Sequence, residues 1–169
     1  NSLKNLGLQP GQDFIMQYHI AGEEGSARPD VIIYLPQDMV VVVDAKASKF
    51  LLELAEVEGT DGEEFTLARL KKSMNDHLRT LAGRDYENAI RQSYKTSGRD
   101  TALGHVFNVM YLPSEAAIEK LRKADAEFDQ KLERTNIILA GPTSLAGLFS
   151  LAKSQIAAAR QNENSEKIV

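Results

Sequence analysis

Two aspartates and a lysine stand out in the sequence because the segment between them predicts a tight hairpin. Asp30 precedes a β-branched run at residues 31–35, and Asp44 closes a second such run that begins at residue 40. The connection between the runs is short, so we expect an antiparallel pair in which residue 30 or 31 lies opposite Asp44. Lys46 follows two residues later and, since side chains alternate along a strand, leaves the same face of the sheet as Asp44.

This juxtaposition predicts metal-assisted hydrolysis of a phosphodiester. Opposed carboxylates repel each other unless a cation lies between them or one of them is protonated. Mg²⁺ and Mn²⁺ suit such oxygen ligands, and bind one or two carboxylates together with water and substrate phosphate. A lysine beside the metal can orient or deprotonate a water molecule and stabilise the charge of the transition state. Asp30, Asp44 and Lys46 are therefore the candidate catalytic residues.

Each fragment of the pattern also has an ordinary structural explanation. An aspartate after a valine-rich strand commonly ends the strand or caps a helix, and Pro29-Asp30 is a common turn dipeptide. The hairpin register, which brings the three side chains together, favours the functional interpretation.

The elements that must position these residues predict an α/β domain, with a central mixed β-sheet flanked by helices. Strands are expected at residues 14–20, 31–35, 40–44, 106–112 and 136–140. Helices are expected within residues 51–64 and at 65–83, 86–94, 114–124, 125–134 and 144–161. Residues 1–161 would then form a single domain and residues 162–169 a polar tail.

Net charge alone does not favour a nucleic-acid ligand. The 169 residues include 20 Lys and Arg against 24 Asp and Glu, for a formal net charge of -4. Between residues 69 and 99, however, eight basic residues outnumber three acidic ones, which gives a local charge of +5. Arg69, Lys72 and Arg79 fall on the solvent side of the long helix, where they could meet phosphates or form an ordinary solvated face.

The composition also bears on compartment. Cysteine is absent, which excludes disulfides, thiolate metal sites and cysteine nucleophiles and fits a reducing environment. No apolar run approaches the length of a membrane span, so we expect cytoplasmic localisation and no membrane contact by this part of the chain. The sequence begins at Asn1 without an initiator methionine, so we expect a fragment of a longer protein.

Three further features have a functional and a structural interpretation. His77 could touch DNA or assist water activation, although a lone helical histidine is more typical of a surface or boundary position. Tyr86 could stack on a base, but a tyrosine in a helix is more typical of the core. The turn at residues 141–144 precedes a helix and could bind phosphate, but it lacks the spacing of a nucleotide loop. We interpret it as a strand-to-helix turn.

The residues around the hairpin resemble a known signature. Arg28-Pro29-Asp30 followed by Val43-Asp44-Ala45-Lys46-Ala47-Ser48 resembles the active-site motif of the PD-(D/E)XK nuclease superfamily. More narrowly, nearly the whole chain resembles the RmuC family of bacterial DNA recombination proteins. The stretches that carry this resemblance are Arg28–Pro36, His77–Tyr86, Val109–Ala117 and Ile137–Leu145.

The resemblance implies a restriction-endonuclease-like core and a metal-dependent DNA nuclease that limits rearrangements such as inversions at short inverted repeats. It implies Mg²⁺ or Mn²⁺ held by Asp30, Asp44 and the backbone carbonyl of Ala45, with Lys46 as the catalytic lysine. Members of the family usually carry an upstream membrane helix and coiled coil, which implies a homo-oligomer and an inner-membrane anchor for the whole protein. Contacts to DNA are expected from Arg28, Lys72, His77, Arg79 and Arg84.

Two other functions stay open from the sequence. The domain could keep the nuclease fold but bind DNA with little or no cleavage, which the net charge of -4 favours. It could also be a metal-free α/β scaffold that binds a protein partner.

Overall fold

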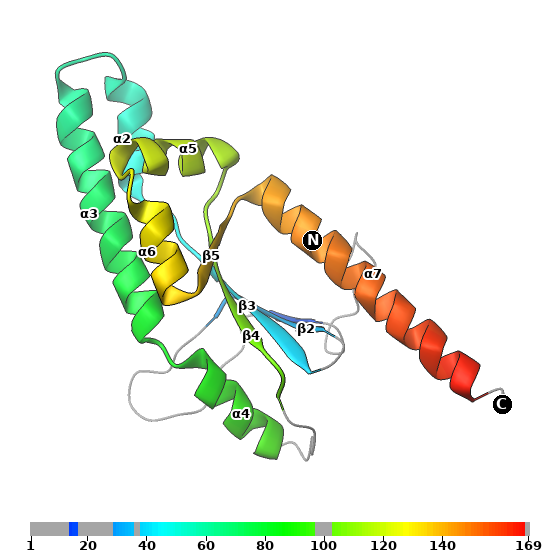
Figure 1. Cartoon of the computed structure of the whole chain (residues 1–169). Coiled ribbons are helices and arrows are strands. Elements are labelled where there is room, and N and C mark those ends of the chain that lie inside the picture. Colours follow the sequence, from blue (N-terminus) through cyan, green and yellow to red (C-terminus); the bar gives the residue numbers. More distant parts are fainter. Residues whose placement is uncertain (1–13, 17–28, 36–37, 97–102, 168–169) are drawn as a thin grey trace.

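The computed structural model describes residues 14–16, 29–35, 38–96 and 103–167. Within them lies a five-stranded mixed sheet in the order β1-β2-β3-β4-β5, which confirms the predicted fold class (Figure 1). The strands are β1 Phe14–Met16, β2 Val31–Leu35, β3 Met39–Ala45, β4 Val106–Tyr111 and β5 Ile137–Ala140. β1, β2 and β3 pair antiparallel, whereas β3, β4 and β5 run parallel.

Helices cover both faces of this sheet (Figure 1). They are α2 Lys49–Val57, α3 Gly62–Gly83, α4 Tyr86–Thr96, α5 Glu115–Ala124, α6 Phe128–Thr135 and α7 Pro142–Glu166. Among the described residues, side chains of α2 to α6 pack on one face and those of α7 pack on the other. Strands buried on both sides read as continuous apolar runs, which explains the four valines of β3. Val40 and Val42 face the layer of α2 to α6, while Val41 and Val43 face α7.

The β2–β3 hairpin has the predicted register. Val31 pairs with Val43 and Leu35 pairs with Met39, a register that extends to Asp30 opposite Asp44. Asp38 adopts a left-handed conformation with φ of 55° in the hairpin turn, which aspartate tolerates better than most residues. β3 begins at Met39, one residue before the predicted start, and the predicted residues 17–20 of the first strand lie outside the described part of the chain.

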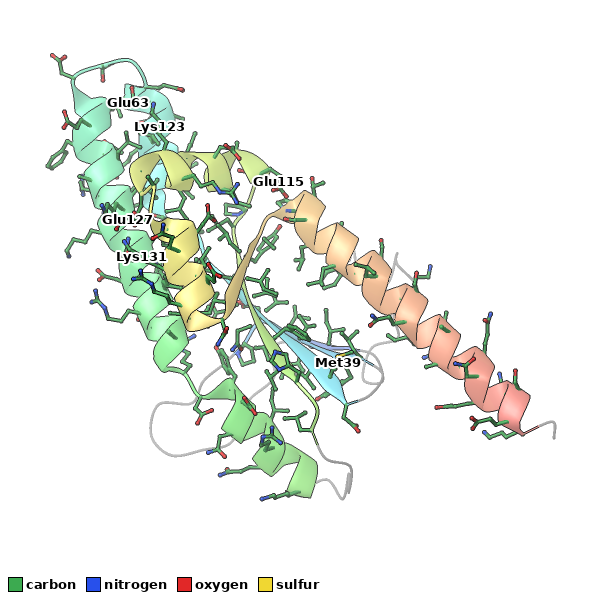
Figure 2. The ribbon with its side chains drawn as sticks, viewed as in Figure 1. Met39, Glu63, Glu115, Lys123, Glu127 and Lys131 are labelled. Carbon is green, nitrogen blue, oxygen red and sulfur yellow. The ribbon has the colours of Figure 1, made fainter. Side chains whose placement is uncertain are left out.

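Helix α3 has one apolar side that packs against the sheet. Leu70, Met74, Leu78 and Leu81 are all buried against the sheet, and the helix ends at Gly83. It begins at Gly62, three residues earlier than expected. Acidic residues in a first turn are favoured by the helix dipole, and Glu63 in that turn also pairs with Lys123 of α5 (Figure 2).

The predicted boundaries of three other helices differ for local reasons. α2 begins at Lys49 because the Ser48 hydroxyl accepts a hydrogen bond from the Phe50 amide at 3.3 Å and caps the helix. α7 begins at Pro142, where proline favours the first turn, and runs to Glu166. The prediction that this helix stops at residue 161 was wrong, because its polar end contains no helix-breaking residue. α6 ends where Asn136 turns left-handed, with φ of 53°, into β5.

A buried carboxylate ties the α5–α6 connection to α3. Asp125, only 2% exposed, accepts hydrogen bonds from Asn75 Nδ2 at 2.8 Å and Lys131 Nζ at 2.7 Å. Lys131, which reaches from α6 toward α3 in Figure 2, also donates to Asn75 Oδ1 at 2.9 Å. Although burial alone would raise it, these hydrogen bonds hold the pKa of Asp125 below its ordinary value.

Replacing Asp125 with alanine should therefore lower the free energy of unfolding at neutral pH by about 2–4 kcal/mol, because Lys131 and Asn75 lose a buried acceptor. Since the folded pKa lies below the unfolded one, this contribution is complete above about pH 4 and is lost as pH falls through the folded pKa. Urea denaturation of both proteins at pH 7 and at about pH 2 measures the difference.

Asp129→Ala is the matched control, because this aspartate is exposed on α6 and pairs with Arg122 across the surface. It should cost less than about 1 kcal/mol. An equal loss in the two variants would contradict a special role for the buried carboxylate.

Candidate active site

The two predicted carboxylates lie at the same end of neighbouring strands. Asp30 precedes β2 by one residue, and its amide donates to the Val43 carbonyl at 3.0 Å. Its Oδ2 accepts a hydrogen bond from the Ala45 amide at 2.7 Å, so the side chain closes the end of β3. Asp44 is the penultimate residue of β3. The prediction that these residues lie nearly opposite each other is confirmed.

The carboxylate of Asp44 is buried and fully engaged. The residue is 3% exposed, and its Oδ1 lies 2.9 Å from Lys46 Nζ, which confirms that the two side chains share a face. Its Oδ2 accepts hydrogen bonds from Arg84 Nη1 at 2.7 Å and from the Tyr86 hydroxyl at 3.0 Å. Arg84 Nη1 also lies 3.1 Å from that hydroxyl. A buried charge needs such partners, and here they come from a segment 40 residues away.

The turn between α3 and α4 delivers these partners. α3 ends at Gly83, and the Arg84 amide donates to the Leu81 carbonyl at 3.2 Å. Asp85 then accepts a hydrogen bond from the Asn88 amide at 3.0 Å, which starts α4 with Tyr86 pointing inward. The ring of Tyr86 is 1% exposed and belongs to the core. The structural interpretation of Tyr86 is therefore confirmed, and a base cannot stack on it in this arrangement.

Sequence reasoning missed the pairing of Arg84 and Tyr86 with Asp44. It placed Arg84 on DNA, and that contact stays a prediction; the structure shows the guanidinium against Asp44 with 32% of its side chain exposed. The only available signal was a cation and an aromatic residue directly after the glycine that ends a helix. Nothing in that signal identifies which strand they meet.

The environment shifts several pKa values around Asp44. Burial raises the pKa of Tyr86 to about 12, and the negative charge of Asp44 adds to this shift, so the hydroxyl remains a donor. Burial opposes the charge of Arg84, but its hydrogen bonds to Tyr86 and Asp44 raise its pKa overall. Burial, together with the positive charge of Lys46, lowers the pKa of His77. The imidazole is therefore predominantly neutral at pH 7.

The other expected DNA contacts lie on α3 or outside the described residues. Lys72 and Arg79 are exposed and approach Asp76 at 3.9 and 3.4 Å, which confirms their solvent-facing positions. His77, one residue further on, feels the charges of Lys46 and Asp44. Arg28 falls in the part of the chain that the structure does not describe.

The donors at the strand ends could hold a divalent cation. Asp30 and Asp44 provide carboxylate oxygens and Ala45 a backbone carbonyl, and hard oxygen donors fit Mg²⁺ or Mn²⁺. Across the described ranges, no three Asp, Glu or His side chains gather closely enough to hold a metal between them. Water and substrate oxygens would complete the coordination, as is usual for Mg²⁺.

The turn before α7 is occupied by a side chain of the protein itself. Glu115 Oε1 accepts hydrogen bonds from the amides of Thr143 at 2.8 Å and Ser144 at 3.1 Å (Figure 2). A Cβ on Gly141 would lie 2.6 Å from that oxygen, so a larger residue there would displace the Glu115 carboxylate. The helix N-terminus is thus satisfied internally, which favours a structural turn over a phosphate site.

In the described part of the chain, no helix is long and apolar enough to cross a bilayer.

Comparison with known proteins identifies relatives along the whole chain. A family model described as RmuC family matches residues 1–169. The protein named DNA recombination protein RmuC homolog of Rickettsia felis is 41% identical over 100% of this chain and 37% of its own length. Its namesake from Pseudomonas aeruginosa is 31% identical over 98% of this chain and 35% of its own length. The chain thus spans little more than a third of these curated relatives.

Replacing Tyr86 with phenylalanine should lower the free energy of unfolding at pH 7 by about 1–2 kcal/mol, because a buried carboxylate loses a donor while the ring packing is kept. Since folding raises the pKa of Tyr86 to about 12, the contribution of the neutral hydroxyl is complete below about pH 10 and is lost as pH rises toward 12. The difference between wild type and variant should shrink across that window in urea denaturation.

Tyr111→Phe, the same chemical change on β4, serves as the control and should alter stability by less than about 0.5 kcal/mol. A Tyr86→Phe protein as stable as wild type would show that the hydroxyl does not support Asp44.

Proposed function

The chain belongs to the RmuC family, and from that membership and the strand-end carboxylates we propose that it is a DNA nuclease domain acting in DNA recombination. Its reaction would be hydrolysis of a phosphodiester with Mg²⁺ or Mn²⁺. The observation that carries the proposal is the lysine 2.9 Å from a buried aspartate near the end of β3, with Asp30 directly before the adjacent strand β2. A mixed sheet with helices on both faces is compatible with a restriction-endonuclease-like core.

The position of each residue in the site determines its proposed role. Asp30, Asp44 and the carbonyl of Ala45 would hold the cation, which, when bound, supplies a more acidic water and neutralises phosphate charge. Lys46 places an ammonium at the edge of this group, where it can orient the attacking water or stabilise the negative charge that develops on the phosphate. Only 18% of its side chain is exposed, so this charge is poorly screened by solvent.

Arg84 and Tyr86 act on the opposite side of Asp44. Both donate to Oδ2, so the plane of the carboxylate is fixed while Oδ1 faces Lys46. A ligand held in one orientation loses less entropy when it binds a cation. We therefore assign these two side chains a positioning role.

One observation favours a second function, DNA binding with little or no cleavage. Asp44 already pairs with two cations, Lys46 and Arg84, so its charge is neutralised without a metal. If those pairs persist in the presence of Mg²⁺, the domain would bind DNA without cleaving it.

Asp44→Ala and Lys46→Ala should each reduce cleavage of a labelled DNA by Mn²⁺-loaded protein by at least about 100-fold, because each removes a group that acts on the reacting phosphate. Gel analysis of products over time measures the rates. Asp129→Asn and Lys153→Gln remove charges of the same sign at exposed positions of α6 and α7. These two variants should cleave at the wild-type rate.

Circular dichroism and thermal unfolding establish that each variant is folded, and Lys46→Ala removes the more exposed of the two side chains. Cleavage at equal rates by wild type and both site variants would refute the proposed mechanism. Salt-dependent binding without cleavage, unchanged in Lys46→Ala, would instead support the DNA-binding function.

A further inference from the structure

An open pocket lies between α3 and the start of α2 and has no role in the proposed mechanism. It has a volume of about 410 Å³ and is lined by Phe50, Arg69, Lys72, Ser73, Asp76 and His77. The five residues from α3 follow the spacing of one helical face, so the pocket runs along α3 against the start of α2. An open site with aromatic, cationic and acidic groups has the chemistry to recognise a composite ligand rather than a simple ion.

The pocket is joined to the proposed active site by a short piece of chain. Lys46 directly follows β3, and Phe50 lies four residues further along the chain. Between them, the Ser48 hydroxyl caps α2 and lies 3.5 Å from the Ser73 hydroxyl, which ties this segment to α3. His77 lies close enough to Lys46 and Asp44 for their charges to act on it. A ligand that fills the pocket would therefore lie next to the candidate metal ligands.

Contacts with two aromatic rings and a carboxylate fix the Arg69 guanidinium in a position where it can bind an anion. Its Cζ lies 4.4 Å from the centre of the Phe50 ring and 5.5 Å from that of Phe65, and Nη1 lies 3.6 Å from Glu53 Oε2. Contacts with aromatic faces leave the donors at the edge of a guanidinium available, and a side chain already fixed loses less entropy on binding. Lys72, one turn along, is exposed apart from a 3.9 Å approach to Asp76.

We propose that this pocket binds one unpaired nucleotide of single-stranded DNA next to the bond that is cleaved, an inference that rests on the proposed function. Arg69 and Lys72 contact the phosphate backbone, and the base lies against the stack of Phe50 and Arg69. Guanidinium and aromatic faces bind bases of any sequence in this way. Asp76 accepts a hydrogen bond from an amino group of the base, since a carboxylate beside a phosphate alone would repel it.

The charge distribution favours a single strand over a duplex. Duplex DNA carries one negative charge per about 1.7 Å of its axis and is bound by broad basic surfaces. The pocket instead includes Asp76, which lies 3.9 Å from Lys72, in a chain whose net charge is -4. A base that is paired and stacked inside a duplex cannot enter such a site without leaving the helix.

Fluorescence anisotropy with a labelled 12-nucleotide single strand and the corresponding duplex tests the proposal, in a Lys46→Ala background with Mg²⁺ so that binding is measured without cleavage. Arg69→Gln and Phe50→Leu should each weaken single-strand binding by about 5- to 30-fold, the equivalent of one lost stacking or phosphate contact. Binding to the duplex should change by less than about twofold. Lys153→Gln on α7, across the sheet, is the matched charge control and should bind like the parent.

Arg69 is partly exposed, so its variant keeps the test valid if Phe50→Leu, which is packed at the edge of the core, fails to fold. Unchanged binding in Arg69→Gln, or equal losses for single strand and duplex, would overturn the pocket assignment. If wild type cleaves DNA but the pocket variants bind normally, only the pocket is wrong. If Asp44→Ala has no effect while the pocket variants lose single-strand binding, the nuclease function is wrong and the pocket stands.

Discussion

A single buried negative charge constrains much of this structure. Asp44 lies next to the end of the valine-rich strand β3 with 3% of its surface exposed, and a carboxylate in that position is stable only with close donors. Lys46 can reach it from the same strand, but the second oxygen requires Arg84 and Tyr86. The end of α3 and the start of α4 must therefore meet the end of β3. The packing of the helical layer and the arrangement of the candidate active site are thus consequences of the same requirement.

Asp125 anchors the same helix at a second point. It holds Asn75 near the middle of α3, while Arg84 holds the segment just after the C-terminus of the helix. Between these anchors, Leu78 and Leu81 pack on the sheet. A helix held in this way carries the side chains on its opposite face at defined distances from the strand-end carboxylates. This rigidity is what allows exposed residues of α3 to be considered together with the site.

Local patterns in the sequence predict the hairpin and the long helix well. A short turn between two apolar runs is enough to place Asp30 near Asp44, and alternation along a strand is enough to place Lys46 beside it. The contacts of Arg84, Tyr86 and Asp125 could not be predicted, because they join segments whose proximity depends on how whole helices pack. The polar end of α7 was also missed, since apolar periodicity gives no signal where a helix is exposed on all sides.

The turn that precedes β3 affects the candidate active site at the other end of the strand. Six residues of roughly 3.3 Å each separate Asp38 from Asp44, which is a distance of about 20 Å. β2 has apolar side chains on both faces. If it slid by one residue along β3, Val31 and Ile33 would change places with Ile32 between the two helical layers, and little apolar surface would be exposed. The same slip would move Asp30 to the opposite side of the sheet from Asp44. The hydrophobic pattern therefore does not fix the register that places Asp30 opposite Asp44. The length of the loop and the hydrogen bond from the Ala45 amide to Asp30 must fix it. Insertions or deletions in this turn, which surface loops usually tolerate, would separate the two acids while leaving the fold intact.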